Sequence, residues 1–143
     1  MFSLILTTNA YAAESSEITT TVKDLGNGLV VISTVEIISA ARDSSKTVVN
    51  KNSYELEGSW VATITLTTSF TYNGITAGVS NATYSKTLAS GWTYNNHKLT
   101  TTNVASSSGG KATLTATLKN GVVSNIPVNM YTHCTPSGYI TTD

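Results

Sequence analysis

Strict alternation of apolar and hydroxyl side chains over residues 60–72 is the feature that most constrains the fold. In WVATITLTTSFTY, aromatic or aliphatic residues stand at positions 60, 62, 64, 66, 70 and 72, and Thr or Ser stands at 63, 65, 67, 69 and 71. A period of two gives this pattern, because successive side chains of a β-strand point to opposite faces of the sheet. The segment is therefore predicted to be a strand with one buried and one wet face, which is typical of an antiparallel sheet.

Two further segments alternate in the same way. Residues 112–118 place Ala and Leu on one face and Thr on the other, and residues 126–134 place Cys134 on the apolar face and Tyr131 on the polar face. Pro127 has no amide hydrogen to donate, so the second of these strands is expected to begin at that point or to run along a sheet edge.

The other predicted strands have weaker patterns. Residues 28–38, GLVVISTVEII, are apolar at odd and even positions alike, which predicts the principal core strand, either covered on both faces or interrupted by a bulge. Residues 18–25, 47–56, 79–88 and 97–104 complete the set. Residues that tolerate a positive φ separate the strands, namely Gly26-Asn27-Gly28, Asn73-Gly74, residues 106–110 and Asn120-Gly121.

Seven or eight strands without an amphipathic helical pattern predict an all-β fold, a two-layer antiparallel β-sandwich of immunoglobulin-like architecture. A chain of 143 residues with 40% apolar residues suits one such domain. The immunoglobulin hallmarks are incomplete, because Cys134 is the only cysteine and Tyr131 stands three residues before it instead of two. The strand topology therefore stays open at this point, and an intramolecular disulfide is excluded.

The first residues predict export from the cell. An apolar run over residues 1–6 precedes Ala10-Tyr11-Ala12, which fits the small-x-small rule of a signal-peptide cleavage site. We therefore expect residues 1–12 to be the remnant of a signal peptide that starts further upstream, and residues 13–143 to form a single secreted domain. The alternative is that residues 2–6 are the first strand of the domain. The run is too short to span a membrane, so no transmembrane segment is predicted.

The overall charge argues against a nucleic-acid partner. Eight basic side chains balance eight acidic ones, and only 11% of the residues are charged, against about a quarter in a typical domain. Such a balance gives no cationic footprint for nucleic acid.

Several short runs carry a family resemblance. The run SFTYNGITAGVSNATYS, followed by SGWTYNNH, GGKATLTATLKNG and YTHCTPSG, resembles small secreted β-sandwich proteins of Gram-positive bacteria, with their Phe-x-Tyr-Asn-Gly hairpin, Trp strand and Cys-x-x-x-Gly segment. The similarity covers residues 55–140. It implies bacterial secretion and a small β fold without catalysis. Some of these proteins carry a second cysteine where this chain has Val79, so the resemblance also implies that Val79 packs near Cys134.

The sequence offers little for catalysis or metal binding. The chain has two histidines and neither a Gly-x-Ser-x-Gly elbow nor a His-Glu-x-x-His pattern. Strand parity predicts that Cys134 points inward as an inert thiol and that His133 points to the opposite face. The two side chains therefore cannot share a metal. Glu55 and Glu57 are expected about 7 Å apart on one strand face, as a solvated acidic patch. We therefore predict no catalytic residue, no metal and no cofactor.

Residues 89–99, ASGWTYNNHKL, are the most site-like stretch of the chain. Sugar-binding sandwiches stack sugar rings on exposed aromatic side chains and orient them with amides. The candidate ligand-binding residues are Trp92, Tyr94, Asn95, Asn96 and His97, with Tyr131. The competing interpretation is that Trp92 plugs the sandwich, Tyr94 closes a loop and the two asparagines form a turn. Burial of Trp92 distinguishes the two.

Threonine rows at residues 63–67 and 113–117 need only their β-propensity as an explanation, since a sugar- or ice-binding array requires a repeat that the sequence lacks. The predicted function is a non-catalytic interaction module of the cell envelope or extracellular space, with a cell-wall or host glycan or a surface protein as partner. The alternative is a carbohydrate-binding module that uses Trp92 and Tyr94.

Overall fold

The computed structural model describes residues 15–40, 44–102, 105–121 and 124–143. Within these ranges the chain forms nine strands and no helix: β1 (Ser15–Gly26), β2 (Leu29–Ser39), β3 (Ser45–Leu56), β4 (Ser59–Tyr72), β5 (Ala77–Leu88), β6 (Thr93–Thr101), β7 (Gly110–Asn120), β8 (Ser124–Cys134) and β9 (Ile140–Thr142). The predicted signal-peptide remnant, residues 1–12, and its alternative as a first strand lie outside the described residues. None of the described segments is a helix that could cross a membrane.

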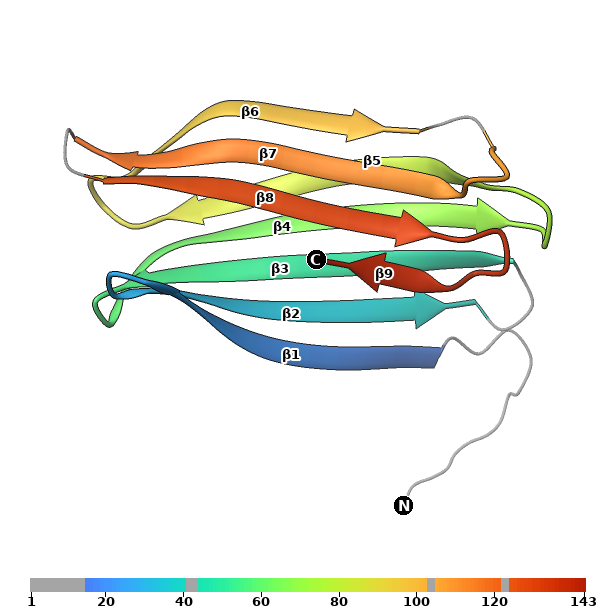
Figure 1. Ribbon diagram of the computed structural model, residues 1–143, viewed down its shortest axis with the longest axis horizontal. Helices are drawn as coiled ribbons and strands as arrows, with labels where there is room; N and C mark the ends of the chain where they lie inside the picture. Colours follow the sequence, from blue (N-terminus) through green and yellow to red (C-terminus); the bar gives the residue numbers. More distant parts are fainter. Residues whose placement is uncertain (1–14, 41–43, 103–104, 122–123) are drawn as a thin grey trace, which may run out of the picture.

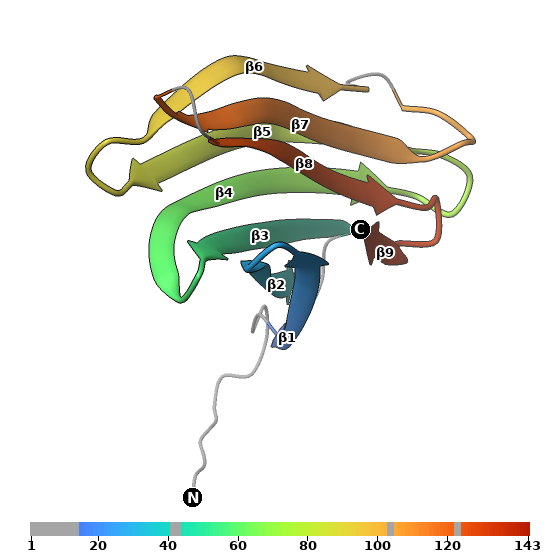
Figure 2. The ribbon, with the colours of Figure 1, turned by 60° about the vertical axis from the view of Figure 1, so that its left-hand side comes forward.

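The strands form two antiparallel layers, which confirms the two-layer β-sandwich (Figure 1). Sheet A has the order β1-β2-β3-β4-β5 and sheet B the order β6-β7-β8-β9. Figure 2 shows sheet B lying over the β3–β5 side of sheet A, with β1 at the far end of the larger sheet.

Two details of the fold prediction differ from the structure. The described residues contain nine strands instead of seven or eight, because β9 has three residues and is too short to show a period. Each sheet also follows the order of the sequence, whereas an immunoglobulin-like sandwich mixes distant strands in Greek-key order. Short connections cause this order, because a tight turn leaves the next strand as the neighbour of the last.

The core lies between β3–β5 and β7–β8. Ile64, Leu66, Leu114, Leu118 and Met130 are all fully buried in the main cluster, which confirms the inward parity predicted for β4, β7 and β8. A second cluster contains Val48, Phe70, Ala77, Val79 and Cys134. Val79 and Cys134 therefore share one cluster, as the family resemblance implied.

The prediction that residues 28–38 form the principal core strand is wrong. Only Val31 of β2 is buried, and every residue of β1 is exposed. The reason is that sheet B makes its main contacts with β3, β4 and β5, so that Leu29, Val35 and Ile37 of β2 pack against the core clusters but stay partly exposed. Apolar residues at both parities of β2 thus face partly solvated surfaces on both sides.

Trp60 also departs from the predicted inward parity. Tyr54 pairs with Ala62 but Glu55 pairs with Trp60, so the register shifts and Val61 is an extra residue in β4. Such a bulge reverses the side-chain parity on its far side. Val61 and Ala62 are consequently both buried, and the Trp60 side chain is 42% exposed.

Most of the turns, and the edge position of Pro127, agree with the predictions. Gly26, Asn27 and Gly28 all have positive φ in the β1–β2 turn. The β3–β4 turn was not among the predicted ones, because Glu57 stands at a positive-φ position that Asn or Asp would mark more clearly. Pro127 lies where β8 has β7 as its only neighbour, since β9 pairs only with residues 132–134, so the edge prediction is confirmed.

Two core hydroxyl groups give a stability prediction. Thr68 and Thr132 are fully buried, and neither hydroxyl oxygen has a hydrogen-bond partner in the described part of the chain. An unsatisfied buried hydroxyl loses its hydration without compensation, so we expect Thr68→Val and Thr132→Val each to raise the free energy of unfolding by about 1 kcal/mol. Urea unfolding measures this, with half-exposed Thr65→Val as the neutral control. A loss of stability in either core variant would contradict the expectation.

Candidate functional site

Trp92 is half-buried, which lies between the exposed sugar platform and the buried plug of the two interpretations. Its amide donates to the Ala89 carbonyl at 3.2 Å in the turn that leads from β5 to β6. The side chains of Trp92 and Tyr94 are half-buried and pack against the main core cluster. The indole therefore anchors the start of β6, and only part of its surface is open to a ligand.

The two asparagines form a bulge in β6. The register with β7 shifts between Asn95 and Lys98, and Asn96 has a φ of 54°. The Asn95 Nδ2 donates to the Thr93 Oγ1 at 2.8 Å. In a regular strand, residues three apart point to opposite faces, but this bulge brings Tyr94 and His97 to the same face.

An aromatic cluster results at the open side of the sandwich, between the edge strands β5 and β6. The Tyr94 and His97 rings stack at 5.8 Å between centroids with an interplanar angle of 19°. Tyr84 of β5 lies 5.3 Å from His97 and 6.0 Å from Tyr94, and the Lys86 ammonium is 5.3 Å from the Tyr94 centroid. We call Tyr84, Lys86, Tyr94 and His97 the edge cluster.

The edge cluster differs from the predicted site. Tyr84 and Lys86 come from the other sheet, and their position beside Tyr94 has no local sequence signal. Burial, followed by the nearby Tyr84 and Tyr54, raises the pKa of Tyr94 to about 12. The Tyr94 hydroxyl oxygen is buried without a hydrogen-bond partner among the described residues. Tyr94 therefore remains a neutral phenol that closes the edge.

Tyr131 lies apart from this cluster. It stacks on His133 of the same strand, with centroids 6.3 Å apart and an interplanar angle of 7°. A His133 Nε2 hydrogen bond to the Ser108 carbonyl oxygen, 2.8 Å long, fixes the imidazole. Of the six predicted residues, Tyr94 and His97 belong to the edge cluster and Tyr131 lies on β8, while Trp92, Asn95 and Asn96 shape the start and the bulge of β6.

Cys134 faces away from His133, as the parity predicted. Its thiol is fully buried, and burial raises the pKa of Cys134 despite the opposing effect of Lys46. A raised pKa keeps the group as an unreactive thiol at neutral pH. In the part of the chain that the structure describes, no three His, Cys, Asp or Glu side chains come together as a metal site would require.

The predicted acidic pair is separated by the fold. Glu55 belongs to the end of β3, whereas Glu57 lies in the β3–β4 turn with a φ of 52°. The two carboxylates therefore do not share one strand face.

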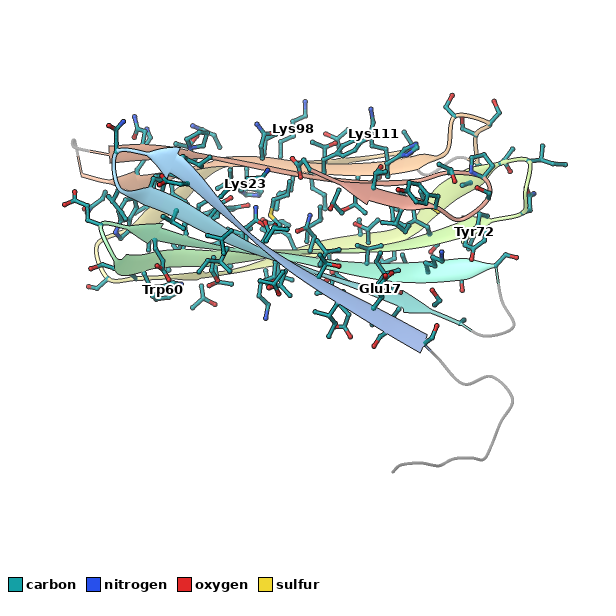
Figure 3. All side chains as sticks on the ribbon, turned by 60° about the horizontal axis from the view of Figure 1, so that its bottom comes forward. Glu17, Lys23, Trp60, Tyr72, Lys98 and Lys111 are labelled. Carbon is teal, nitrogen blue, oxygen red and sulfur yellow. The ribbon has the colours of Figure 1, made fainter. Side chains whose placement is uncertain are left out.

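Three lysines follow the outer face of sheet B. Lys111 and Lys119 are eight residues apart on β7, and Lys98 of β6 pairs with Thr115, midway between them. Strand rise places successive lysines about 14 Å apart. Figure 3 shows Lys98 and Lys111 projecting from the sheet away from the sandwich. We call Lys98, Lys111 and Lys119 the lysine row.

Hydroxyl groups fill the face between the lysines. Thr113, Thr115 and Thr117 are half-exposed on the same side of β7, and Tyr131 pairs with Thr113. The only acidic residue after residue 57 is Asp143, whose carboxylate oxygen accepts a hydrogen bond from the Tyr131 amide of β8, so sheet B carries more cationic than acidic side chains. The balanced total charge of the chain concealed the fact that most acidic residues precede residue 58.

No protein-family model matches the chain, and no curated protein or solved structure matches it either. The fold and its surfaces alone therefore define the class: a two-sheet antiparallel β-sandwich with an aromatic cluster at one edge and a cationic, hydroxyl-rich face.

Proposed function

We propose that the protein is an exported, non-catalytic binding domain that attaches to an acidic polysaccharide outside the cell. The observation that carries this proposal is the lysine row, which crosses a threonine-rich face formed by β6 and β7, two strands that contain no acidic residue. Carboxylates on a polysaccharide would meet the ammonium groups, and the sugar hydroxyls would meet the threonine hydroxyls between them.

The spacing of the cations favours a polymer that is less densely charged than nucleic acid. Duplex DNA carries one charge per about 1.7 Å of its axis, while the lysines follow one another at about 14 Å. A polysaccharide with hydroxyls between its charges suits this alternation of cation and hydroxyl better. Threonine alone would be explained by β-propensity, so the lysines are what distinguish this face.

Export and the absence of catalysis have their own support. Ala10-Tyr11-Ala12 fits a cleavage site, and the resemblance to secreted proteins of Gram-positive bacteria points to the same compartment. The Cys134 thiol is buried, and the His133 imidazole is engaged by the Ser108 carbonyl. Neither side chain is placed to act as a nucleophile or a base.

The edge cluster supports a second candidate function, a carbohydrate-binding module for single sugar units. His97 is exposed beside Tyr84 and Tyr94, with Lys86 over the Tyr94 ring. Trp92 and Tyr94, the predicted aromatic pair, are both half-buried, and Tyr94 is the one that stacks on the exposed His97 ring.

The test replaces all three lysines of the row by Gln and measures binding to polygalacturonate, with neutral dextran as the uncharged polymer. Exposed charge pairs contribute about 0.2–1 kcal/mol each, so the triple variant is expected to bind about 3-fold to 150-fold more weakly. The single Lys98→Gln variant should also bind more weakly than the wild type, and Lys51→Gln, at an exposed lysine of β3 in sheet A, is its matched control. Salt should weaken wild-type binding in parallel.

Each alternative has its own outcome. Failure of the wild type to bind polygalacturonate would contradict the proposal, as would an equal loss in Lys51→Gln. Tighter binding to duplex DNA would replace the polysaccharide by nucleic acid. A sugar signal that Tyr84→Ala abolishes and the triple lysine variant retains would favour the edge cluster.

A further inference from the structure

β1 is a long edge strand without a neighbour on one side. Among the residues that the structure describes it pairs with β2 only, and all twelve of its residues are exposed. Ile18 and Val22, on one face of the strand, are 62% and 66% exposed. An edge of this length presents a row of free backbone donors and acceptors, which is a template for a further strand.

The sequence of β1 is complementary to itself. In SSEITTTVKDLG, Thr20 has Ile18 and Val22 two residues away on its two sides, and Glu17 and Lys23 three residues away. Figure 3 shows Glu17 and Lys23 towards opposite ends of the strand. If the direction of the strand is reversed about Thr20, Glu17 takes the place of Lys23, and Ile18 takes the place of Val22.

We propose that two copies of the chain associate by antiparallel pairing of β1 with β1 about a two-fold axis through Thr20, which joins the two A sheets into one continuous sheet. Glu17 of each copy then lies opposite Lys23 of the other, and Ile18 lies opposite Val22. Opposite charges and apolar side chains are the cross-strand pairs that stabilise antiparallel sheets. Each contact occurs twice, as the isologous symmetry of a dimer requires.

Neighbouring registers lack these pairs. A two-fold axis through Thr21 would place Ile18 opposite Asp24 and Glu17 opposite Leu25. An axis through Thr19 would place Lys23 opposite Ser15. Charge complementarity therefore selects the register centred on Thr20. The dimer uses the edge of sheet A, far from the lysine row on sheet B, so it does not depend on polysaccharide binding.

Cysteine cross-linking tests the register directly. Residues directly opposite each other in an antiparallel pair have Cα atoms about 4.5–5.5 Å apart, within reach of a disulfide. Mild oxidation of Thr20→Cys is therefore expected to give a covalent dimer. Val22→Cys, on the same face, is the control, because its symmetry mate lies four residues further along, about 14 Å away. Equal cross-linking of both variants, or none in Thr20→Cys, would overturn the register.

Charge exchange tests the pairing without a covalent bond. Glu17→Lys places two cations opposite each other twice per dimer, and we expect sedimentation equilibrium to show a dissociation constant at least about tenfold higher than that of the wild type. The double variant Glu17→Lys/Lys23→Glu restores opposite charges and should restore dimerisation. Lys86→Glu, which reverses an exposed charge on β5 at the opposite edge of sheet A, should leave it unchanged. A monomeric wild type, or a double variant that remains as weak as the single one, would refute the dimer.

Discussion

Phe70→Ala is expected to lower the free energy of unfolding by about 3–5 kcal/mol. Phe70 is fully buried in the second core cluster, where Val48, Val79 and Cys134 surround it. Removal of the ring takes away apolar burial and leaves a cavity that two backbone layers cannot readily fill. Since a domain is typically stable by about 5–15 kcal/mol, the variant should lose a large share of its stability.

Denaturant unfolding measures this loss as a lower midpoint at an unchanged slope. Ile75→Ala is the control, because that side chain is 75% exposed in the β4–β5 turn. The neighbouring Cys134 supplies a second readout, since its thiol should react faster with a thiol reagent once the ring is gone. An effect on stability below about 1 kcal/mol would mean that the cluster collapses onto the space instead.

Gly110→Ala should destabilise the protein by steric conflict between the two sheets. A Cβ at Gly110 would lie 2.8 Å from the Gly78 carbonyl carbon, 2.9 Å from the Gly78 Cα and 3.1 Å from the Phe70 Cδ1. The Phe70 ring can shift slightly, but the β5 backbone cannot do so without parting from β7. We expect a loss of about 1–3 kcal/mol, the usual range for an overpacked core.

Thermal unfolding of Gly110→Ala beside Lys111→Ala separates this effect from general changes in β7, because Lys111 is exposed at the next position. Gly110 is not among the glycines with positive φ, so backbone strain does not contribute. A melting temperature equal to that of the wild type would show that the sheets can separate at this contact without cost.

Local periodicity predicted most strands and the side chains that the central ones bury. The alternation of β4 and β7 holds because both faces of these strands have a fixed environment, one core and one solvent. It failed for β2, whose coverage depends on how many strands the opposite sheet contains. That number is a non-local property, which a window of eleven residues does not contain.

The candidate site shows the same division. Tyr94 and His97 were predicted as candidate residues from the aromatic and amide residues gathered in residues 89–99, but their stacking depends on a bulge at Asn96, and Tyr84 joins them from the other sheet. The lysine row, by contrast, could have been found in the sequence from the positions of the charged residues. Seven of the eight acidic residues precede residue 58, and equal totals of acid and base concealed that asymmetry.

The sequential order of both sheets has a consequence for how the chain folds. β5 ends at Leu88 and β6 begins at Thr93, so residues 89–92 are the single passage from sheet A to sheet B. Each layer can thus be assembled hairpin by hairpin from one continuous half of the chain. Local pairing of this kind has a low contact order, which favours fast folding for an all-β protein. The association of the two completed sheets is then the one folding step that brings together residues far apart in the sequence. Two fragments produced by dividing the chain within residues 89–92 should therefore associate into the folded domain.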